Sequence, residues 1–488
     1  MPQQAPAGVA REPRGELNWL HRLFAFFATP GGGLTVLGHI DSEGRRVAVV
    51  GSGISGLTAA LRLERAGFEV DLIESGDVLG GRMGAAHLGD RPVMLGGKNI
   101  GHKYDAFRGF LGALGSYEWQ PFGINASMMK EGEVLTLDST KRNRSINNIR
   151  RMGAPRDLAK LLNLVAHIRL EESNKFLGST YFSKLGSRRD HQPLSAWFGR
   201  TLTNTLLRPM TVRMNGAEPD EVYLGNFNTN LALLLDTYDQ LTHSIQPALD
   251  AMANRVNARL HTKAEGLVIS GGRVTGLKLS EKGGPAEEES YDGVVIATPA
   301  YATAEIVASE LPGLGKRLKD ARYFPSSVVV VEYDRPVFTP EVRALAMHDG
   351  GPCSNAGSYG MEDRHIVRYT FSGRNGRTGK DGQSLTTAPE QLEEWVGEAE
   401  ERLTRYLSAS RAKRVNSVSR AWDAAYCAYS PFHSEFLTEV RAAVASVPGL
   451  ELSGDYLWGV SLEACARSGN EAGAKLSHYL TGTSPVRA

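Results

Sequence analysis

Residues 46–57 read Arg-Val-Ala-Val-Val-Gly-Ser-Gly-Ile-Ser-Gly-Leu, in which a β-branched run leads directly into three spaced glycines. Apolar residues then recur at helical spacing over residues 54–66, Gly67 ends that helix, and a second β run occupies residues 68–73. A strand, a tight turn, a helix and a strand within about 30 residues form a βαβ unit, whose strands pair in parallel. The sequence therefore predicts an α/β fold that starts from this unit.

Each glycine of this turn has a separate physical role. Gly51 permits the tight turn, Gly53 lets the backbone approach a pyrophosphate because it has no Cβ, and Gly56 lets the helix and strand pack closely. The free N–H groups at the helix N-terminus then hold the phosphates. Glu74 ends the second strand, 18 residues after Gly56, where it can accept hydrogen bonds from a ribose. The spacing predicts a dinucleotide site, and the acid argues against a 2′-phosphate.

Composition excludes several other classes of protein. The 488 residues carry 55 Lys and Arg against 54 Asp and Glu, a balance that argues against DNA or an anionic membrane as a global partner. The three cysteines (Cys353, Cys427 and Cys465) form no Cys-x-x-Cys pattern, which argues against a disulfide framework, a zinc ribbon or an iron–sulfur cluster. No metal is expected. Neither a zinc-protease motif nor a hydrolase nucleophile elbow occurs, which disfavours hydrolases.

After Glu74 the chain continues Ser-Gly-Asp-Val-Leu-Gly80-Gly81-Arg82. Together with the glycine turn, this arrangement resembles the FAD-binding segment of the flavin-containing amine oxidase superfamily. That superfamily includes monoamine and L-amino acid oxidases, protoporphyrinogen oxidase and the carotenoid desaturases. The resemblance implies that the cofactor is FAD and that Arg82 supplies a fixed charge to its pyrophosphate.

Two later segments extend the resemblance. Residues 261–277 resemble the strand pair that flanks the adenine, and residues 450–476 resemble the closing FAD segment, whose helix would start at residues 460–464 and point at the flavin ring. The dipole of that helix would stabilise negative charge on the reduced flavin. The residues that the resemblance assigns to FAD are Gly51, Gly53, Ser55, Gly56, Glu74, Gly80, Gly81, Arg82, Gly97, Ala264, Gly454, Asp455 and Leu462.

Other segments indicate a branch of the superfamily. Residues 420–460 and 325–338 resemble protoporphyrinogen oxidase and the desaturases more than the amine oxidases, and Val328 stands near the place of the amine-oxidase strand lysine. Residues 93–104 depart from the family pattern, although by position they should approach the flavin ring. Lys98 and His102 there would either meet flavin or substrate charge or lie on the surface. The candidate catalytic residues are Lys98, Asn99, His102, Tyr456 and Trp458.

These features predict an FAD-dependent oxidoreductase that removes a hydride from an organic small molecule, forming a C=C or C=N bond. Reduced flavin would be reoxidised by O2, and the substrate would belong to specialised metabolism. Two alternatives stay open: an amine or L-amino acid oxidase, and a catalytically inactive flavin-bound scaffold. Hydride transfer needs alignment more than an acid–base pair, which fits the absence of a recognisable catalytic triad.

The alternation of segments predicts a Rossmann-like FAD-binding domain (residues 45–100, 245–315 and 440–488) interleaved with a mixed α+β substrate-binding domain (101–244 and 316–439). The latter should contain several helices and few strands over 101–244, and residues 247–260 of the former should form a helix. Residues 1–44 form an extension whose amphipathic helix, 17–28, packs on the main domain or contacts a partner chain, a second copy or a membrane surface. The basic segment 141–156 is a solvated helix face or a patch for an anion. No transmembrane segment or signal peptide is visible, so a cytoplasmic location is expected.

Overall fold

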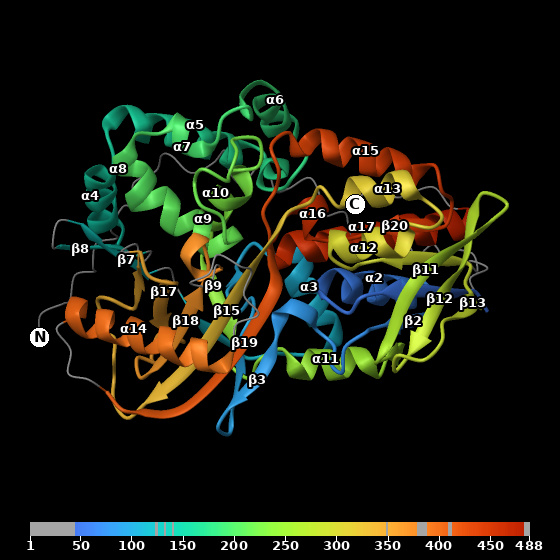
Figure 1. The fold of residues 1–488 in the computed structure, drawn as a ribbon, viewed down its shortest axis with the longest axis horizontal. Helices are drawn as coiled ribbons and strands as arrows, with labels where there is room; N and C mark the ends of the chain where they lie inside the picture. The colour runs from blue at the N-terminus through green and yellow to red at the C-terminus, as the bar shows by residue number, and fades with distance from the viewer. Residues whose placement is uncertain are drawn as a thin grey trace, which may run out of the picture. The chain divides into compact units, whose positions relative to one another are not determined.

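The structure is a computed structural model that describes residues 44–122, 125–130, 133–138, 141–347, 350–377, 388–407 and 412–482. These residues belong to one compact unit, which spans residues 42–488. The predicted helix over residues 17–28 lies outside the described residues. The described chain is a mixed α/β structure with several sheets (Figure 1).

A five-stranded sheet in which all strands are parallel collects segments from three distant parts of the chain. Its order is β10 (Asn257–Arg259), β2 (Glu69–Ile73), β1 (Arg46–Val50), β14 (Gly293–Ile296) and β20 (Leu450–Leu452). The inner strands β1 and β14 are almost entirely apolar and buried, as expected for a parallel sheet that is covered on both faces. The predicted βαβ unit is confirmed, with β1 paired in parallel to β2 and joined to it by α2 (Ile54–Arg65).

Helix α17 (Leu462–Thr481) packs along α2, so the last helix of the chain lies beside the first one described (Figure 1). Small residues make this close approach possible. A Cβ on Gly469 would lie 2.0 Å from the carbonyl oxygen of Ser55, and a Cβ on Gly473 would lie 3.0 Å from that of Ala59. The C-terminal segment is therefore built into the same layer as the glycine turn.

A second large sheet has seven strands and is covered by α14 (Pro389–Leu407) through Trp395 and Val396. Its apolar face includes Tyr369 and Phe371, both fully buried. The strand order is β19 (Arg414–Cys427), β15 (Tyr323–Tyr333), β18 (Ile366–Phe371), β17 (Cys353–Ser358), β16 (Ala344–Ala346), β7 (Asn125–Lys130) and β8 (Glu133–Asp138).

Helices between β8 and β9 form a separate apolar cluster around Phe182, Leu207 and Phe227. They are α4 (Arg142–Met152), α5 (Pro155–Leu170), η2 (Glu172–Lys175), α6 (Thr180–Arg189), α7 (Leu194–Trp197), α8 (Arg200–Leu202), the π-helical turn η3 (Thr203–Leu207), α9 (Arg208–Asn215) and α10 (Asn228–Leu234).

The remaining elements are short strands, hairpins and helices that surround the two large sheets. They are η1 (Gly81–Met83), β3 (Ala85–Leu88), β4 (Arg91–Met94), β5 (Ile100–Gly101), α3 (Asp105–Leu114), β6 (Trp119–Pro121), β9 (Tyr238–Leu241), α11 (Gln246–Ala253), β11 (Thr262–Ser270), β12 (Arg273–Glu281), β13 (Glu287–Ser290), α12 (Ala300–Val307), α13 (Pro312–Leu318), η4 (Arg374–Gly376), α15 (His433–Ala445) and α16 (Asp455–Trp458).

Residues 101–244 hold several helices, as expected, and also supply the strands β7 and β8 to the edge of the seven-stranded sheet. Local propensity does not reveal these two strands, because the sheet that offers them partners is formed by other segments. One expectation about local structure was wrong. The helix expected after Pro247 ends at Ala253, and residues 257–259 form β10 because they pair with β2.

The basic segment 141–156 forms the exposed helix α4 and the start of α5. Arg144 and Arg150 are exposed, and Arg151 forms an ion pair with Glu133. This placement favours the interpretation of a solvated helix face.

Among the described residues, no helix combines the length and the apolar character needed to cross a bilayer.

Candidate functional site

The turn between β1 and α2 is shaped as the glycine spacing requires. Gly51 has φ +97° and donates its N–H to the carbonyl of Ile73 at 2.8 Å, which fixes the turn on the end of β2. A Cβ on Gly56 would lie 1.8 Å from the carbonyl oxygen of Gly51, so only glycine allows this helix to start here. A Cβ on Gly53, in contrast, would meet nothing within 4 Å.

The N-terminus of α2 is left open beside Gly53. No side chain caps it, and its first turn contains no acidic residue. The N–H groups and the positive end of the helix dipole therefore face free space, as an approaching phosphate requires. These features fit a dinucleotide pyrophosphate.

Glu74 lies at the mouth of this turn. Its Oε2 accepts hydrogen bonds from the Ser52 N–H at 3.0 Å and from the Ser52 hydroxyl at 2.5 Å, and its Oε1 accepts one from the Gly76 N–H at 2.8 Å. The predicted adenine-flanking strand starts next to it, because Thr262 N–H donates to the carbonyl of Glu74 at 2.9 Å. Ala264 is buried in this strand. The carboxylate is thus held in one place by the backbone of the turn.

Gly80 and Gly81 bring the next segment onto the glycine turn. Both have positive φ, +106° and +53°, and the Gly80 N–H donates to the carbonyl of Ser52 at 3.0 Å. A Cβ on Gly81 would lie 3.3 Å from Cα of Gly53. The predicted segments 51–56 and 80–82 therefore form one surface.

Arg82 joins this surface to the end of the chain. Its Nη1 donates to Asp455 Oδ2 at 2.7 Å and to the carbonyl of Ala425 at 3.1 Å. Asp455, only 2% exposed, also accepts a hydrogen bond from the Tyr323 hydroxyl at 2.7 Å. Burial lowers the pKa of Arg82, but the charge of Asp455 more than offsets this, so the net pKa is raised and Arg82 stays charged.

The start of α17 lies against the segment after β4. Ser461 caps the helix by accepting a hydrogen bond from the Ala464 N–H at 3.0 Å. A Cβ on Gly97 would lie 3.4 Å from Leu462, and Gly97 itself is exposed. The structure therefore brings together two residues that the sequence assigned to FAD from opposite ends of the chain.

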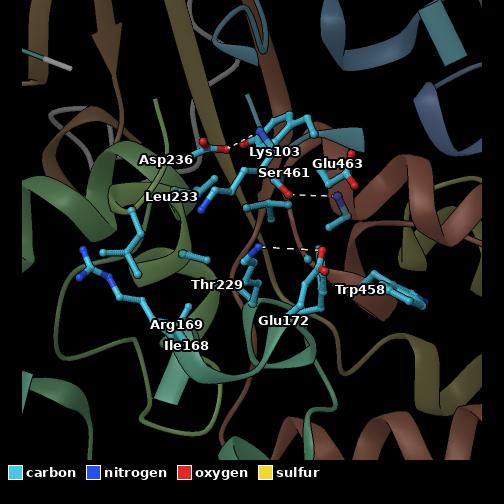
Figure 2. Close-up of a pocket in the computed structure, with 18 residues that line it drawn as sticks. Lys103, Ile168, Arg169, Glu172, Thr229, Leu233, Asp236, Trp458, Ser461 and Glu463 are labelled. Atoms are coloured by element: carbon cyan, nitrogen blue, oxygen red, sulfur yellow. Dashed lines mark hydrogen bonds and ion pairs between the residues drawn. The ribbon is translucent and has the colours of Figure 1, made fainter. Parts of the chain in front are cut away.

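A cavity of about 460 Å³ opens at this helix start (Figure 2). It is lined by the end of α5, by η2, by α10, by the residues preceding α3 and by residues 458–464, and charges of both signs surround it. Lys103 N–H donates to Asp236 at 3.2 Å, and Glu172 pairs with Lys175. Trp458 and Ser461 form the wall that belongs to the C-terminal segment.

Of the five candidate catalytic residues, only Trp458 lines this cavity. Its Nε1 donates to Glu471 at 2.8 Å. Tyr456 is fully buried, and His102 is exposed and bonded to Asp239 at 2.9 Å. Asn99 Oδ1 is buried and has no hydrogen-bond partner among the described residues.

Lys98 is buried, 6% exposed, so the surface alternative for this residue was wrong. Its Nζ donates to Gln240 Oε1 at 2.9 Å and to the carbonyl of Tyr359 at 2.6 Å. The ammonium also lies 3.7 Å from the centroid of the Phe122 ring. Burial lowers the pKa of Lys98 well below its usual range.

Sequence reasoning missed three residues of this region. Tyr323 holds the carboxylate of Asp455, Arg368 donates to the carbonyl of Gly96 at 2.8 Å, and Arg213 is electrostatically coupled to Lys98. Arg368 left a signal, since it is a charged residue inside the apolar run of β18. Among the described residues, no group of three His, Cys, Asp or Glu side chains is arranged to hold a metal.

The fold and the turn define a dinucleotide-binding protein, and comparison with known proteins identifies its class. The model of the flavin-containing amine oxidoreductase family matches residues 54–476. The coproporphyrinogen III oxidase of Mycobacterium tuberculosis is 24% identical over 461 residues, covering 88% of this chain and 96% of that protein. The chain belongs to the flavin-containing amine oxidoreductase family and is an FAD-dependent oxidoreductase.

Solved structures share the fold over nearly the whole chain. Cyclohexylamine oxidase from Brevibacterium oxydans superposes with a TM-score of 0.69 at 17% identity, covering 89% of this chain and 99% of that one. A fatty acid isomerase from P. acnes that produces CLA superposes with a TM-score of 0.63 at 14% identity, covering 88% and 97%. Proteins with such different names share this architecture, so the fold alone does not identify the substrate.

Proposed function

We propose that this enzyme removes a hydride from a carbon of an organic small molecule, in the manner of the porphyrinogen oxidases and desaturases, and that O2 reoxidises its flavin. The observation that carries the proposal is the Arg82–Asp455 pair, which joins the glycine turn to the C-terminal segment. The near full-length relation to a coproporphyrinogen III oxidase supports the choice of branch. By its position in the sequence, Val328, which is 1% exposed in β15, would stand near the place of the amine-oxidase lysine.

We assign the cofactor end of the site to the residues that surround the open turn. Gly51, Gly53, Ser55 and Gly56 would receive the pyrophosphate, and Glu74 the ribose. Gly80, Gly81 and Arg82, with Gly454 and Asp455, would complete this end, and Ala264 would flank the adenine. Gly97 and Leu462 would border the flavin ring.

The chain contributes position and charge to the reaction. FAD, when bound, accepts the hydride. If the ring lies beside Gly97 and Leu462, the positive dipole end at the N-terminus of α17 would favour negative charge on it. Trp458 and the apolar wall of the cavity would orient the substrate and exclude water.

We also propose that the two large sheets belong to two domains with different functions. Residues 45–100, 245–315 and 440–488, which supply every strand of the parallel sheet, would form the FAD-binding domain. Residues 101–244 and 316–439, which supply the seven-stranded sheet and the helical cluster, would form the substrate-binding domain.

Anaerobic reduction of the purified yellow protein tests the proposal. Coproporphyrinogen III should bleach the flavin absorption near 450 nm, and admission of air should restore it with uptake of O2. Cyclohexylamine is the matched comparison, and it should leave the spectrum unchanged. Bleaching by the amine alone would replace this proposal with amine oxidation, and a flavin that only dithionite reduces would favour the inactive scaffold.

A further inference from the structure

Three cationic side chains gather beside residues 96–99, and none of them lines the cavity of Figure 2. Lys98 follows β4, Arg368 lies in β18 and Arg213 lies in α9. The fold brings them together, because Arg368 donates to the carbonyl of Gly96, two residues before Lys98, and α9 packs against β17, the neighbour of β18. After burial, the charges of Arg368 and Arg213 are the largest causes that lower the pKa of Lys98. Arg213 likewise lowers the pKa of Arg368.

These cations have almost no anionic partner in the described part of the chain. Lys98 contacts two neutral oxygens, and Arg368 donates to the carbonyl of Gly96. The side chain of Arg213 forms no hydrogen bond or ion pair with a described residue. The nearby carboxylate of Asp363 is already held by Arg91, through two hydrogen bonds of 2.8 and 2.6 Å.

Such an arrangement is unfavourable for folding. Like charges repel strongly where little water screens them, and buried cations in folded proteins are normally paired. Burial lowers the pKa of Arg213 and of Arg368, which shows that their surroundings disfavour the charged forms. An anion bound between these side chains would offset both the repulsion and the cost of burying the charges. The cluster therefore fits ligand binding better than a stabilising role.

The cluster adjoins the residues proposed to hold FAD. Gly96, whose carbonyl Arg368 contacts, directly precedes Gly97, the neighbour of Leu462. Tyr426 interacts electrostatically with both arginines, and the preceding residue, Ala425, accepts a hydrogen bond from Arg82. A molecule held by the cluster would therefore reach the same region as the flavin ring.

We propose that Lys98, Arg213 and Arg368 bind an anionic group of the substrate, a carboxylate or a phosphate ester, and so select an anionic substrate over an amine. The identification of this anion as part of the substrate rests on the proposed function. The anion site itself rests on the unpaired cations alone, so the two ideas are tested by different measurements.

Titration of the flavin-loaded protein at constant ionic strength tests the site directly. Benzoate and phenyl phosphate distinguish the two anions, and benzylamine is the cationic comparison of similar size. One of the two anions should perturb the flavin absorption spectrum and raise the Tm, and benzylamine should do neither. If neither anion binds, or if benzylamine binds as well as they do, the proposal is wrong.

Arg213→Met is the informative variant, because Arg213 has no hydrogen bond to lose among the described residues. It should weaken the binding of the anion about tenfold or more and raise the Tm of the anion-free holoprotein by about 1–2 °C, since like-charge repulsion is relieved. Arg213→Lys should keep most of the affinity. Arg255→Met, which removes an arginine paired with Glu64 at the surface, should change neither affinity nor spectrum.

The outcomes separate this inference from the proposed function. A fall in Tm and an unchanged anion affinity in Arg213→Met would make Arg213 a structural residue and overturn the inference. Reduction by coproporphyrinogen III would in that case still stand. Conversely, a wild-type protein that binds benzoate but is reduced by no hydride donor would retain the anion site and lose the proposed function.

Discussion

The two ends of the proposed FAD site differ in which part of the chain is available for binding. Around the glycine turn the backbone is exposed, and the charged side chains there are paired, as Arg82 is with Asp455. Around residues 96–99 the charged side chains are unpaired instead: Lys98, which is buried, and Arg213 have no carboxylate partner in the described residues. A backbone site suits a ligand of fixed structure, whereas a side-chain site can be altered to suit a particular substrate.

Substitution within the glycine turn should give the largest effect. Gly53→Val adds atoms to open space, so the apoprotein should keep its free energy of unfolding within about 1 kcal/mol, yet it should purify without flavin. Gly56→Ala is the contrast, because its Cβ would overlap the carbonyl of Gly51 and disturb the fold itself. Absorption near 450 nm and thermal unfolding separate the two. A yellow Gly53→Val protein would show that the phosphates do not bind here.

Breaking the ion pair between Arg82 and Asp455 should give the second largest effect. Asp455→Asn removes the charge that opposes Arg82, and we expect the free energy of unfolding to fall by about 2–3 kcal/mol, less than for a fully buried pair because the side chain of Arg82 is 33% exposed. Flavin retention should fall with it. Glu64→Gln, which breaks a surface pair with Arg255, should cost less than about 1 kcal/mol. Equal effects in chemical denaturation of the two variants would contradict the role given to Asp455.

A smaller effect should follow at the ribose position. Glu74→Ala removes a charged acceptor, so FAD affinity should weaken by about 1.5 kcal/mol, roughly tenfold. Glu69→Ala alters an exposed acid at the other end of the same strand and serves as the control. Equilibrium titration of each apoprotein with FAD gives the comparison. An unchanged affinity in Glu74→Ala would remove this residue from the site.

The same contrast explains how far sequence reasoning reached. The βαβ unit was predictable because local geometry dictates residue type: Gly51 has a positive φ and Gly56 has no room for a Cβ. Such constraints act within a few residues and leave a readable pattern. The role of the Gly80–Arg82 turn was inferred only from the family resemblance and stays a prediction.

Contacts between residues that are remote in the sequence left little comparable pattern in it. Nothing in the neighbourhood of Arg213 indicates that α9 would bring it toward Lys98, which comes 115 residues earlier in the numbering. Strand β10 was read as helix because its partner β2 is remote in sequence. Strands β7 and β8 were missed because the edge they complete is formed by later segments.

The last prediction concerns the like-charge repulsion around Lys98 in the protein without a bound anion. Burial lowers the pKa of Lys98 most, the charges of Arg368, Arg213 and Arg91 lower it further, and the carboxylate of Asp363 only partly opposes these effects. Between this lowered pKa and the usual value of 10.5, the unfolded chain holds a proton on Lys98 that the folded chain has lost. Raising the pH through that window therefore increases the free energy of unfolding through this residue, by at most about 1.4 kcal/mol per pH unit.

Lys98→Met should remove this contribution. Urea unfolding of wild type and variant between pH 7 and pH 10 should show a stability difference that shifts in favour of the wild type as pH rises. A difference that does not change with pH would mean that Lys98 stays charged in the folded protein. A group on the protein would then have to balance this charge. The difference between the paired charges around the glycine turn and the unpaired cations around residues 96–99 would no longer hold.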